Sequence, residues 1–426
     1  MMAYTWWELL FYLLLYAFLG WAVGVVYHAL KDGRFINRGL LNLPISLSEG
    51  MTAVILLLTL PTMEGHPVWQ FLMTWLVVWI TDEVTHLFLA RVSRAAMAKR
   101  HVESVSWVIT GVLRTAEALL YLLLYLLIHP YICLFVNWLP DFALMITVVV
   151  LGILVLADYL GVRYALGHGC QSRGGRKVRP WTEKLGDHVT EAVWRRLEQA
   201  YPGIERAALR DPGGHIFAKG LCFDKLVCLF LIASFLGALI EMVYCRITGG
   251  TWMNRSSLVY GPFSVVWGLG AVLLTVVLRR MAGKPDRYVF LAGFVVGGAY
   301  EYLCSVFTEL VYGTVFWDYS YQPLNFGGRT SVLFCTFWGI LAVVWVKMLY
   351  PPIDRGIELV PPVAGKVLTW IIVVAMASNM LLTSAAMIRY NTRQTRPESA
   401  GWIEMLIDER FDDDWMENRW PNMKRT

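Results

Sequence analysis

Three glutamates, Glu241, Glu301 and Glu309, lie within strongly apolar stretches of the chain. An ionisable side chain in the hydrocarbon region of a membrane is costly, so it usually faces the protein interior and pairs with another group. Arg255 and Arg329 lie near the ends of these stretches and are the expected counter-charges. A buried carboxylate that finds no cation tends to take up a proton. The residues therefore leave two interpretations open, a structural glutamate–arginine pair or a site that responds to protons or cations.

Two of these glutamates continue series of small residues at four-residue steps. The series are Ala233, Gly237, Glu241, Cys245 and Gly293, Gly297, Glu301, Ser305. Residues four apart lie on one face of a helix, and small residues on that face let two helices approach closely in lipid. We therefore expect each glutamate to lie at a contact between two helices, where the two carboxylates could share a partner.

A polar segment, WDYSYQPLNFGGR at 317–329, separates two apolar stretches in the same half of the chain. Its candidate site residues are Trp317, Asp318, Tyr319, Asn325 and Arg329. Its proline and paired glycines favour turns. We expect a loop outside the membrane that caps the helix ends and is closed by an ion pair between Asp318 and Arg329. Asn254 and Arg255 complete the candidate substrate, proton or ion site.

The first half of the chain carries fewer such groups. Glu83 occupies the position that corresponds to Glu301, and His86 lies one helical turn from it. His86 is either a proton relay or an ordinary polar contact. We treat these two residues as secondary candidates.

The composition indicates a membrane protein. Of 426 residues, 57% are hydrophobic and only 16% are charged, whereas soluble domains carry about 25% charged residues. Apolar windows of transmembrane length recur. The net charge of +5 fits basic loops near anionic lipid better than a nucleic-acid surface. The sequence contains no metal-ligand spacing, P-loop or hydrolase motif. We therefore predict an all-α polytopic membrane protein that is not an enzyme and has no cofactor.

Ten transmembrane helices are predicted, in two sets of five. The first set is 5–28, 44–60, 68–90, 108–128 and 142–162; the second is 223–245, 259–278, 288–311, 331–349 and 367–388. The sets resemble two copies, because 18–41 matches 235–258 at a constant offset of 217. The predicted parts are a degenerate repeat at 1–165, a linker at 166–221, a second repeat at 222–390 and a charged tail at 391–426.

An odd number of spans per copy makes the second copy enter the membrane from the opposite face. Positively charged loops mark the cytoplasmic side. The linker carries +4 and loop 279–287 carries +3, whereas the tail carries −2 and loop 246–257, at +2, disagrees. We therefore expect inverted repeats, with the linker and loop 279–287 in the cytoplasm and both chain ends outside.

Separate predictions apply to the linker 166–221 and to the tail 391–426. Apolar residues recur at four-residue steps in the linker, at Trp181, Leu185, Val189, Val193 and Leu197. This pattern predicts an amphipathic helix, either on the cytoplasmic membrane surface or packed against the protein. The tail mixes acids with tryptophans, and we expect it to be solvated or interfacial, with a docking surface as the alternative.

These motifs together resemble the bacterial family named Putative ABC-transporter type IV permease. The resemblance rests on Glu241, NRSSLVYGP at 254–262, YEYLCSVFTEL at 300–310, WDYS at 317–320 and Gly328-Arg329. It covers 222–350, and NRGLLNLP at 37–44 makes the first half a degenerate copy. Ser256 stands where the family pattern has glycine, and the first half lacks WDYS.

The resemblance implies a multi-pass protein of the bacterial plasma membrane that serves as a permease. Since the chain has no ATPase motif, ATP-driven transport would require a separate ATPase subunit, and a homo-oligomer is a further expected assembly. A membrane-embedded enzyme, or an accessory or sensor protein of the cell envelope that transports nothing, remains the alternative.

Overall fold

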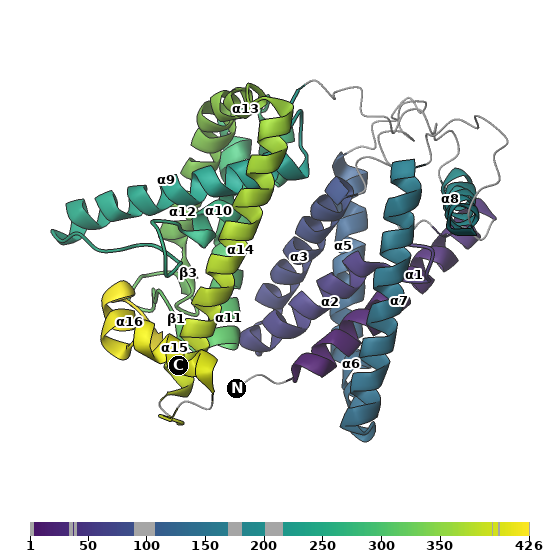
Figure 1. Ribbon diagram of the computed structural model, residues 1–426, viewed down its shortest axis with the longest axis horizontal. Helices are drawn as coiled ribbons and strands as arrows, with labels where there is room; N and C mark the ends of the chain where they lie inside the picture. The colour runs from purple at the N-terminus through teal and green to yellow at the C-terminus, as the bar shows by residue number, and fades with distance from the viewer. Residues whose placement is uncertain are drawn as a thin grey trace. The chain divides into compact units, whose positions relative to one another are not determined.

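The computed structural model describes residues 4–33, 37, 41–88, 107–168, 181–200, 216–393, 395–398 and 401–425 (Figure 1). The chain divides into two compact units, residues 2–212 and 213–426. In the described ranges, seven helices are long and apolar enough to cross a membrane. The protein is therefore an all-α, multi-pass membrane protein, as predicted.

The unit 2–212 consists of helices. They are α1 (Trp6–Asp32), α2 (Leu47–Thr59), a 3₁₀ turn (Leu60–Met63), α3 (Pro67–Phe88), α5 (Trp107–Leu123), a π-helical turn (Leu124–Ile128), α6 (His129–Trp138), α7 (Asp141–His168) and α8 (Trp181–Ala200). A capping box starts α1, because Thr5 and Glu8 each accept a hydrogen bond from the other's backbone N–H.

The unit 213–426 repeats this order and adds a folded C-terminal segment. Its helical elements are α9 (Phe223–Gly249), α10 (Val265–Leu278), a 3₁₀ turn (Arg279–Met281), α11 (Asp286–Tyr312), α12 (Val332–Val344), a π-helical turn (Trp345–Leu349), α13 (Tyr350–Glu358), α14 (Pro362–Thr392), α15 (Trp402–Arg410) and α16 (Asp413–Arg419). Strand β1 (Thr314–Val315) pairs antiparallel with β4 (Lys424–Arg425), and β2 (Asn325–Phe326) with β3 (Thr330–Ser331).

Several irregular features recur at corresponding places in the two units. Helices α1 and α9 both end at a glycine with a left-handed backbone, Gly33 and Gly250. Both units have a π-helical turn of five residues, and the next helix carries a proline in its first turn, Pro130 or Pro351. Because π-helical turns are uncommon, their repetition at corresponding places agrees with the sequence evidence for duplication.

In the second unit, α10 begins beside the middle of α9. The Ser264 N–H donates a hydrogen bond to the Ser234 carbonyl oxygen at 2.9 Å. Gly237 allows this close approach, because a Cβ there would lie 2.2 Å from Cγ of Trp267. At 1.5 Å per residue, Ser234 lies about 22 Å before the C-terminal end of α9. The loop 250–264 therefore folds back along α9 before α10 starts.

Helix α12 begins in the same way beside the middle of α11. A Cβ at Gly293 would lie 2.2 Å from Cβ of Ala342, and one at Gly297 would lie 2.3 Å from Cβ of Trp338. The series of small residues on α11 therefore does lie at a helix contact. The start of α12 lies about 17 Å before the C-terminal end of α11, so loop 313–331 also folds back.

The structure of these folded-back loops differs from two predictions made from the sequence. The predicted span 259–278 contains a helix of only 14 residues, whereas a full crossing needs about 20. Residues 317–329 do not merely cap the helix ends, because they return along α11. Hydropathy describes the composition of a segment and not the position of its ends beside neighbouring helices. The first unit has the same arrangement, since the Ser46 N–H donates to the Ala17 carbonyl oxygen at 2.8 Å.

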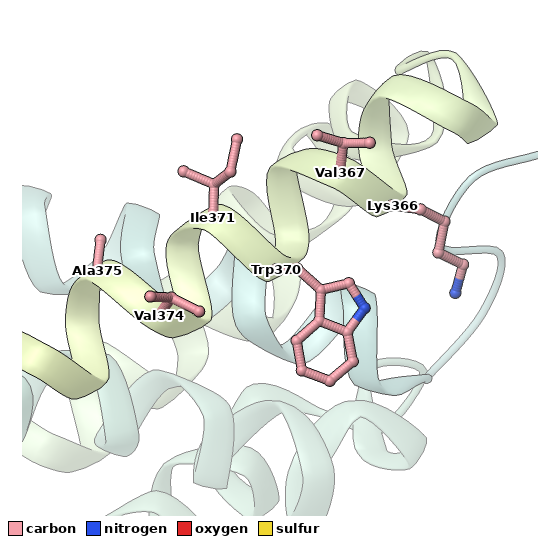
Figure 2. A pocket seen from close by; sticks show the side chains of 6 residues that line it. All are labelled: Lys366, Val367, Trp370, Ile371, Val374 and Ala375. Carbon is pink, nitrogen blue, oxygen red and sulfur yellow. The ribbon is translucent and has the colours of Figure 1, made fainter.

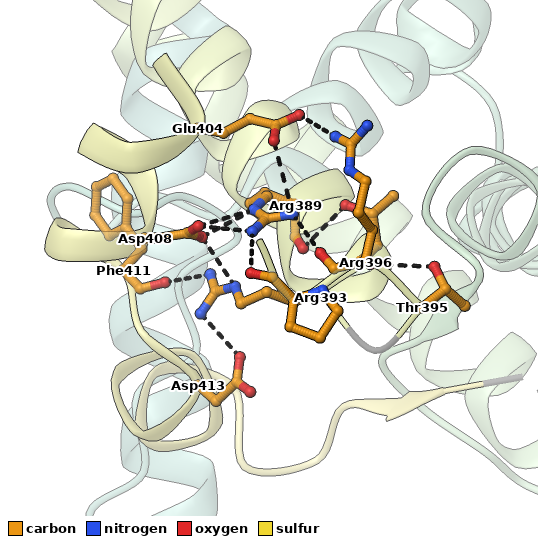
Figure 3. Close-up of polar contacts among 10 residues, drawn as sticks. Arg389, Arg393, Thr395, Arg396, Glu404, Asp408, Phe411 and Asp413 are labelled. Atoms are coloured by element: carbon orange, nitrogen blue, oxygen red, sulfur yellow. Dashed lines mark hydrogen bonds and ion pairs between the residues drawn. The ribbon is translucent and has the colours of Figure 1, made fainter. Parts of the chain in front are cut away.

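The C-terminal segment packs on its own unit, contrary to the expectation of a solvated tail. Ile407, Phe411, Met416 and Trp420 are buried in a cluster with residues of α14 and with Val259. Figure 3 shows arginines at the end of α14 contacting acids of this segment. Acids that suggested a solvated tail, such as Asp408 and Asp413, form these pairs.

The predicted linker helix is α8, and it packs on α7. Val193, Trp194 and Leu197 are buried, and the Trp194 indole N–H donates to the Ala165 carbonyl oxygen at 3.4 Å. This contact favours the packed alternative for the described side chains of α8.

Candidate functional site

Glu241 on α9 forms an ion pair with Arg255, which loop 250–264 carries back along the helix. Nη2 of Arg255 lies 3.0 Å from Oε1 of Glu241. The neighbouring Asn254 accepts a hydrogen bond from the Ser256 N–H at 2.9 Å, which forms a local turn. The sequence named Arg255 as a counter-charge for the glutamates without assigning it to one of them.

Glu309 on α11 forms an ion pair with Arg329 of loop 313–331, the arginine for which the sequence predicted a pair with Asp318. Arg329 also donates to Oγ of Ser305 at 3.2 Å, and its guanidinium carbon lies 5.7 Å from the ring centre of Tyr302. The Trp317 indole N–H donates to the Arg329 carbonyl oxygen at 2.8 Å. Arg329 therefore fixes the return of this loop along α11.

Glu301 is the most enclosed of the three glutamates, with 7% of its surface exposed. The Tyr319 hydroxyl donates to its Oε1 at 3.0 Å, and the Thr330 hydroxyl donates to its Oε2 at 2.7 Å. Within the part of the chain that the structure describes, no cationic side chain forms an ion pair with Glu301. Tyr319 and Thr330 therefore act here as hydrogen-bond donors to Glu301.

The two loops bring these groups into one region of the second unit. Tyr319 lies within electrostatic reach of Glu241 and Arg255 as well as Glu301. The site then holds three carboxylates and two guanidinium groups, and the remaining carboxylate, Glu301, has the uncharged partners Tyr319, Thr330 and Trp338. Among the contacts described, Glu241 and Glu301 have no common hydrogen-bond partner, although the sequence allowed one.

Asp318 and Arg329 do not form the predicted ion pair. Asp318 instead accepts hydrogen bonds from the N–H and hydroxyl of Ser320, at 2.9 and 2.5 Å, and lies 3.1 Å from Nζ of Lys424. Arg329 points to Glu309, because loop 313–331 is folded against α11. The expected charges are present, but each meets a different partner.

Asn325 shapes the same loop from within. Its side-chain amide donates to the Gln322 carbonyl oxygen at 2.8 Å, and its Oδ1 accepts the Gly328 N–H at 2.9 Å. Gly328 has a φ of +71°, and a Cβ there would lie 2.5 Å from Oγ of Ser320. The loop therefore needs glycine at this position.

Thr330 and Ser305 are site contacts that the sequence did not single out. Thr330 directly follows Arg329, and Ser305 continues the small-residue series of Glu301. These sequence positions could have indicated the two residues, but a hydroxyl group alone does not predict a functional site.

The secondary candidates Glu83 and His86 lie on α3, and their side chains are outside the described ones. The first unit nevertheless has its own polar cluster. Asp82 and Glu117 pair with Arg114, and the Tyr121 hydroxyl donates to Glu49. This half therefore retains buried polar contacts at positions other than those predicted.

A separate groove runs along α14 and is apolar. Figure 2 shows its lining, Val367, Trp370, Ile371, Val374 and Ala375, with Lys366 at one end. Four of these side chains are more than half exposed. Such a surface suits contact with lipid chains and lacks the polar groups of a binding site for a polar solute.

The helices and the enclosed acid–arginine site define an integral membrane protein with polar groups placed inside a helical unit. A family model described as Putative ABC-transporter type IV matches residues 11–162 and 228–384. These segments make up more than half of the chain, and the protein belongs to this family. The match confirms the resemblance, covers both halves, and makes the protein permease-like. Neither curated proteins nor solved structures gave a match.

Proposed function

We propose that this protein is the membrane-spanning subunit of a transporter and that Glu301 is its proton- or ion-exchanging group. The observation that carries the proposal is the environment of Glu301, a buried carboxylate with hydroxyl donors and no ion pair among the described residues. A carboxyl group in such surroundings can gain or lose a charge within a folded helical unit. Glu241 and Glu309, which have arginine partners, then act mainly as structural supports of the site.

The discontinuous helices support this location. Transporters place their binding sites where short helices begin near the middle of the membrane, because irregular backbone and helix ends supply polar groups there. Helices α10 and α12 both begin beside the middle of a long helix, and both loops reach the region of Glu301. Part of this irregular backbone is buried in protein, at Leu258, Val259 and Thr330, as irregular backbone at membrane depth requires.

The same arrangement supports inverted five-span repeats. Helices α9 and α11 each cross the unit, and the chain then returns to the starting side through α10 or through the 27-residue helix that begins as α12 and continues to Glu358. With α14 as the last crossing, the unit makes five passes, an odd number, although α10 has only 14 residues. With the charge bias, this topology puts loop 279–287 in the cytoplasm and loops 250–264 and 313–331 on the outer side of a bacterial plasma membrane. A separate ATPase would supply energy if transport uses ATP.

Infrared difference spectroscopy in lipid nanodiscs tests the role of Glu301 without a known substrate. We expect a carboxylic-acid carbonyl band that titrates in the intact chain and is lost in Glu301→Gln. Glu409→Gln, at an exposed position on α15, should retain the band. In proteoliposomes with a trapped pH-sensitive dye, Glu301→Gln should also abolish any proton flux that the intact chain carries.

The decisive comparison uses Glu301→Gln protein that still folds. If the titrating band persists in this variant, Glu301 is not the exchanging group. If the variant instead fails to assemble while Glu409→Gln assembles normally, the glutamate is a structural residue and the proposal is wrong.

A further inference from the structure

The C-terminal segment contacts loop 250–264 through the backbone of that loop. The Trp420 indole N–H donates to the Ser256 carbonyl oxygen at 2.7 Å. The Arg419 guanidinium donates to the Leu258 carbonyl oxygen at 2.6 and 3.1 Å and to the Gly261 carbonyl oxygen at 2.9 Å. Irregular backbone inside a membrane protein needs such donors, since water is scarce there.

The same segment also contacts loop 313–331. Strand β4 pairs with β1 at the start of this loop, with Thr314 opposite Arg425. Lys424 lies 3.1 Å from Asp318, and the rings of Phe316 and Trp420 are 6.3 Å apart. One segment therefore bridges the two loops that bring Arg255 and Tyr319 to the glutamates.

Helix α14 provides the fixed base for this bridge. Arg389 is 2% exposed and pairs with Asp408 of α15, and Arg393 pairs with Asp413 of α16 (Figure 3). A buried arginine with several hydrogen bonds holds its partner more firmly than an exposed pair does. The start of the segment is thus anchored to α14, and its end lies on the loops.

We propose that Arg419 and Trp420 are positioning residues of the glutamate site and that the C-terminal segment closes this site at the end where α11 and α14 terminate. The inference rests on the proposed function, because it assigns a gate to the same site. Any opening toward that end moves loops 250–264 and 313–331, and such a movement breaks the contacts of Arg419 and Trp420. Both residues act through backbone carbonyl groups and not on a transported solute.

Loop 250–264 keeps other supports when these contacts are removed. The Val259 N–H donates to Oγ1 of Thr383 at 3.0 Å, and the Asn379 amide donates to the Tyr260 carbonyl oxygen at 2.8 Å. Both partners are on α14. Variants of Arg419 and Trp420 should therefore fold, with a loop that opens more often.

A native thiol can report this opening. Cys335 is a free, buried cysteine on α12, and its sulfur lies 3.7 Å from Oγ1 of Thr330, which donates to Glu301. Cys228 is a free, buried cysteine in the first half of α9. It serves as an internal control for general unfolding.

The experiment measures modification of each cysteine by a charged, membrane-impermeant methanethiosulfonate reagent, with peptide mass spectrometry as the readout. Nanodiscs make both membrane faces accessible. We expect Arg419→Ala to speed modification of Cys335 by about tenfold, because several hydrogen bonds are lost, with little change at Cys228. Trp420→Phe, which keeps the packing, should give a smaller increase. Lys424→Ala should change the rate by less than about twofold, because this pair is exposed.

Equal rates for Cys335 in the intact chain, Arg419→Ala and Trp420→Phe would overturn the inference. If Cys228 accelerates as much as Cys335 in both variants, the two residues stabilise the fold and do not gate the site. The result is separable from the test of function. A gate can be present while Glu301 fails its infrared test, and Glu301 can titrate while these variants leave Cys335 protected.

Discussion

At the scale of single residues, Asp318 determines the shape of loop 313–331. The Ser320 hydroxyl, then the Ser320 N–H and then Lys424 lower the pKa of Asp318 from its usual value of 3.8 to about 2. A carboxyl group whose pKa is lowered by folding stabilises the protein above its unfolded pKa, and this contribution is lost as the pH falls through the folded value. We expect the contribution of Asp318 to disappear between about pH 4 and pH 2.

Acid titration of Asp318→Asn measures this effect as a difference from the intact chain. Tryptophan fluorescence in nanodiscs should show the variant less stable at about pH 6, and the difference should shrink below about pH 4. Asp414→Asn, at an exposed position on α16, should match the intact chain throughout. A difference that stays constant down to pH 2 would show that the charge of Asp318 does not stabilise the loop.

The charged members of the site were predictable, but their uncharged partners were not. That the glutamates have arginine partners follows from the high cost of an isolated charge in an apolar environment, but which arginine pairs with which glutamate does not. Thr330 has no comparable signal, because hydroxyl groups occur throughout membrane helices. The direction of Arg329 was also hidden, since it depends on how far the loop folds back.

At the scale of helices, the contact between α11 and α12 positions the site. A Cβ at Gly297 would lie 2.3 Å from Cβ of Trp338, too close without a shift of one helix. We expect Gly297→Ala to destabilise the protein by about 1–3 kcal/mol, the usual cost of overpacking. The variant should also weaken the contact of Thr330 with Glu301, because Thr330 lies two residues before the start of α12 at Val332.

Gly152→Ala on α7 is the matched control, since no atom lies within 4 Å of a Cβ at that position. Alanine has the higher helix propensity, so this variant should melt at the same temperature as the intact chain or slightly higher. Thermal unfolding in one detergent compares the two. If Gly297→Ala melts like Gly152→Ala, the close helix contact is not needed for stability.

At the scale of the whole molecule, hydropathy predicted where the helices lie but not how long each of them is. A helix was found at each predicted span, because length and apolar composition determine that pattern. The short lengths of α2 and α10 were not predicted, since their loops are apolar enough to extend the signal. The folded C-terminal segment was not predicted. Its acids suggested contact with solvent, and the sequence does not show that they pair with arginines at the end of α14.

The topology of the chain gives the broadest prediction. If each repeat makes five passes, as we propose, we expect the linker and loop 279–287 on one face of the membrane and the C-terminal segment on the other. In intact cells, an impermeant thiol reagent applied outside should leave native Cys170 and Gly283→Cys unmodified and should modify Ala400→Cys. Permeabilised cells, in which all three become accessible, provide the control. Modification of Cys170 and Gly283→Cys from opposite faces would exclude inverted repeats, because α9 and α10 are the only predicted spans between these positions, and opposite faces would mean that α10 does not return the chain.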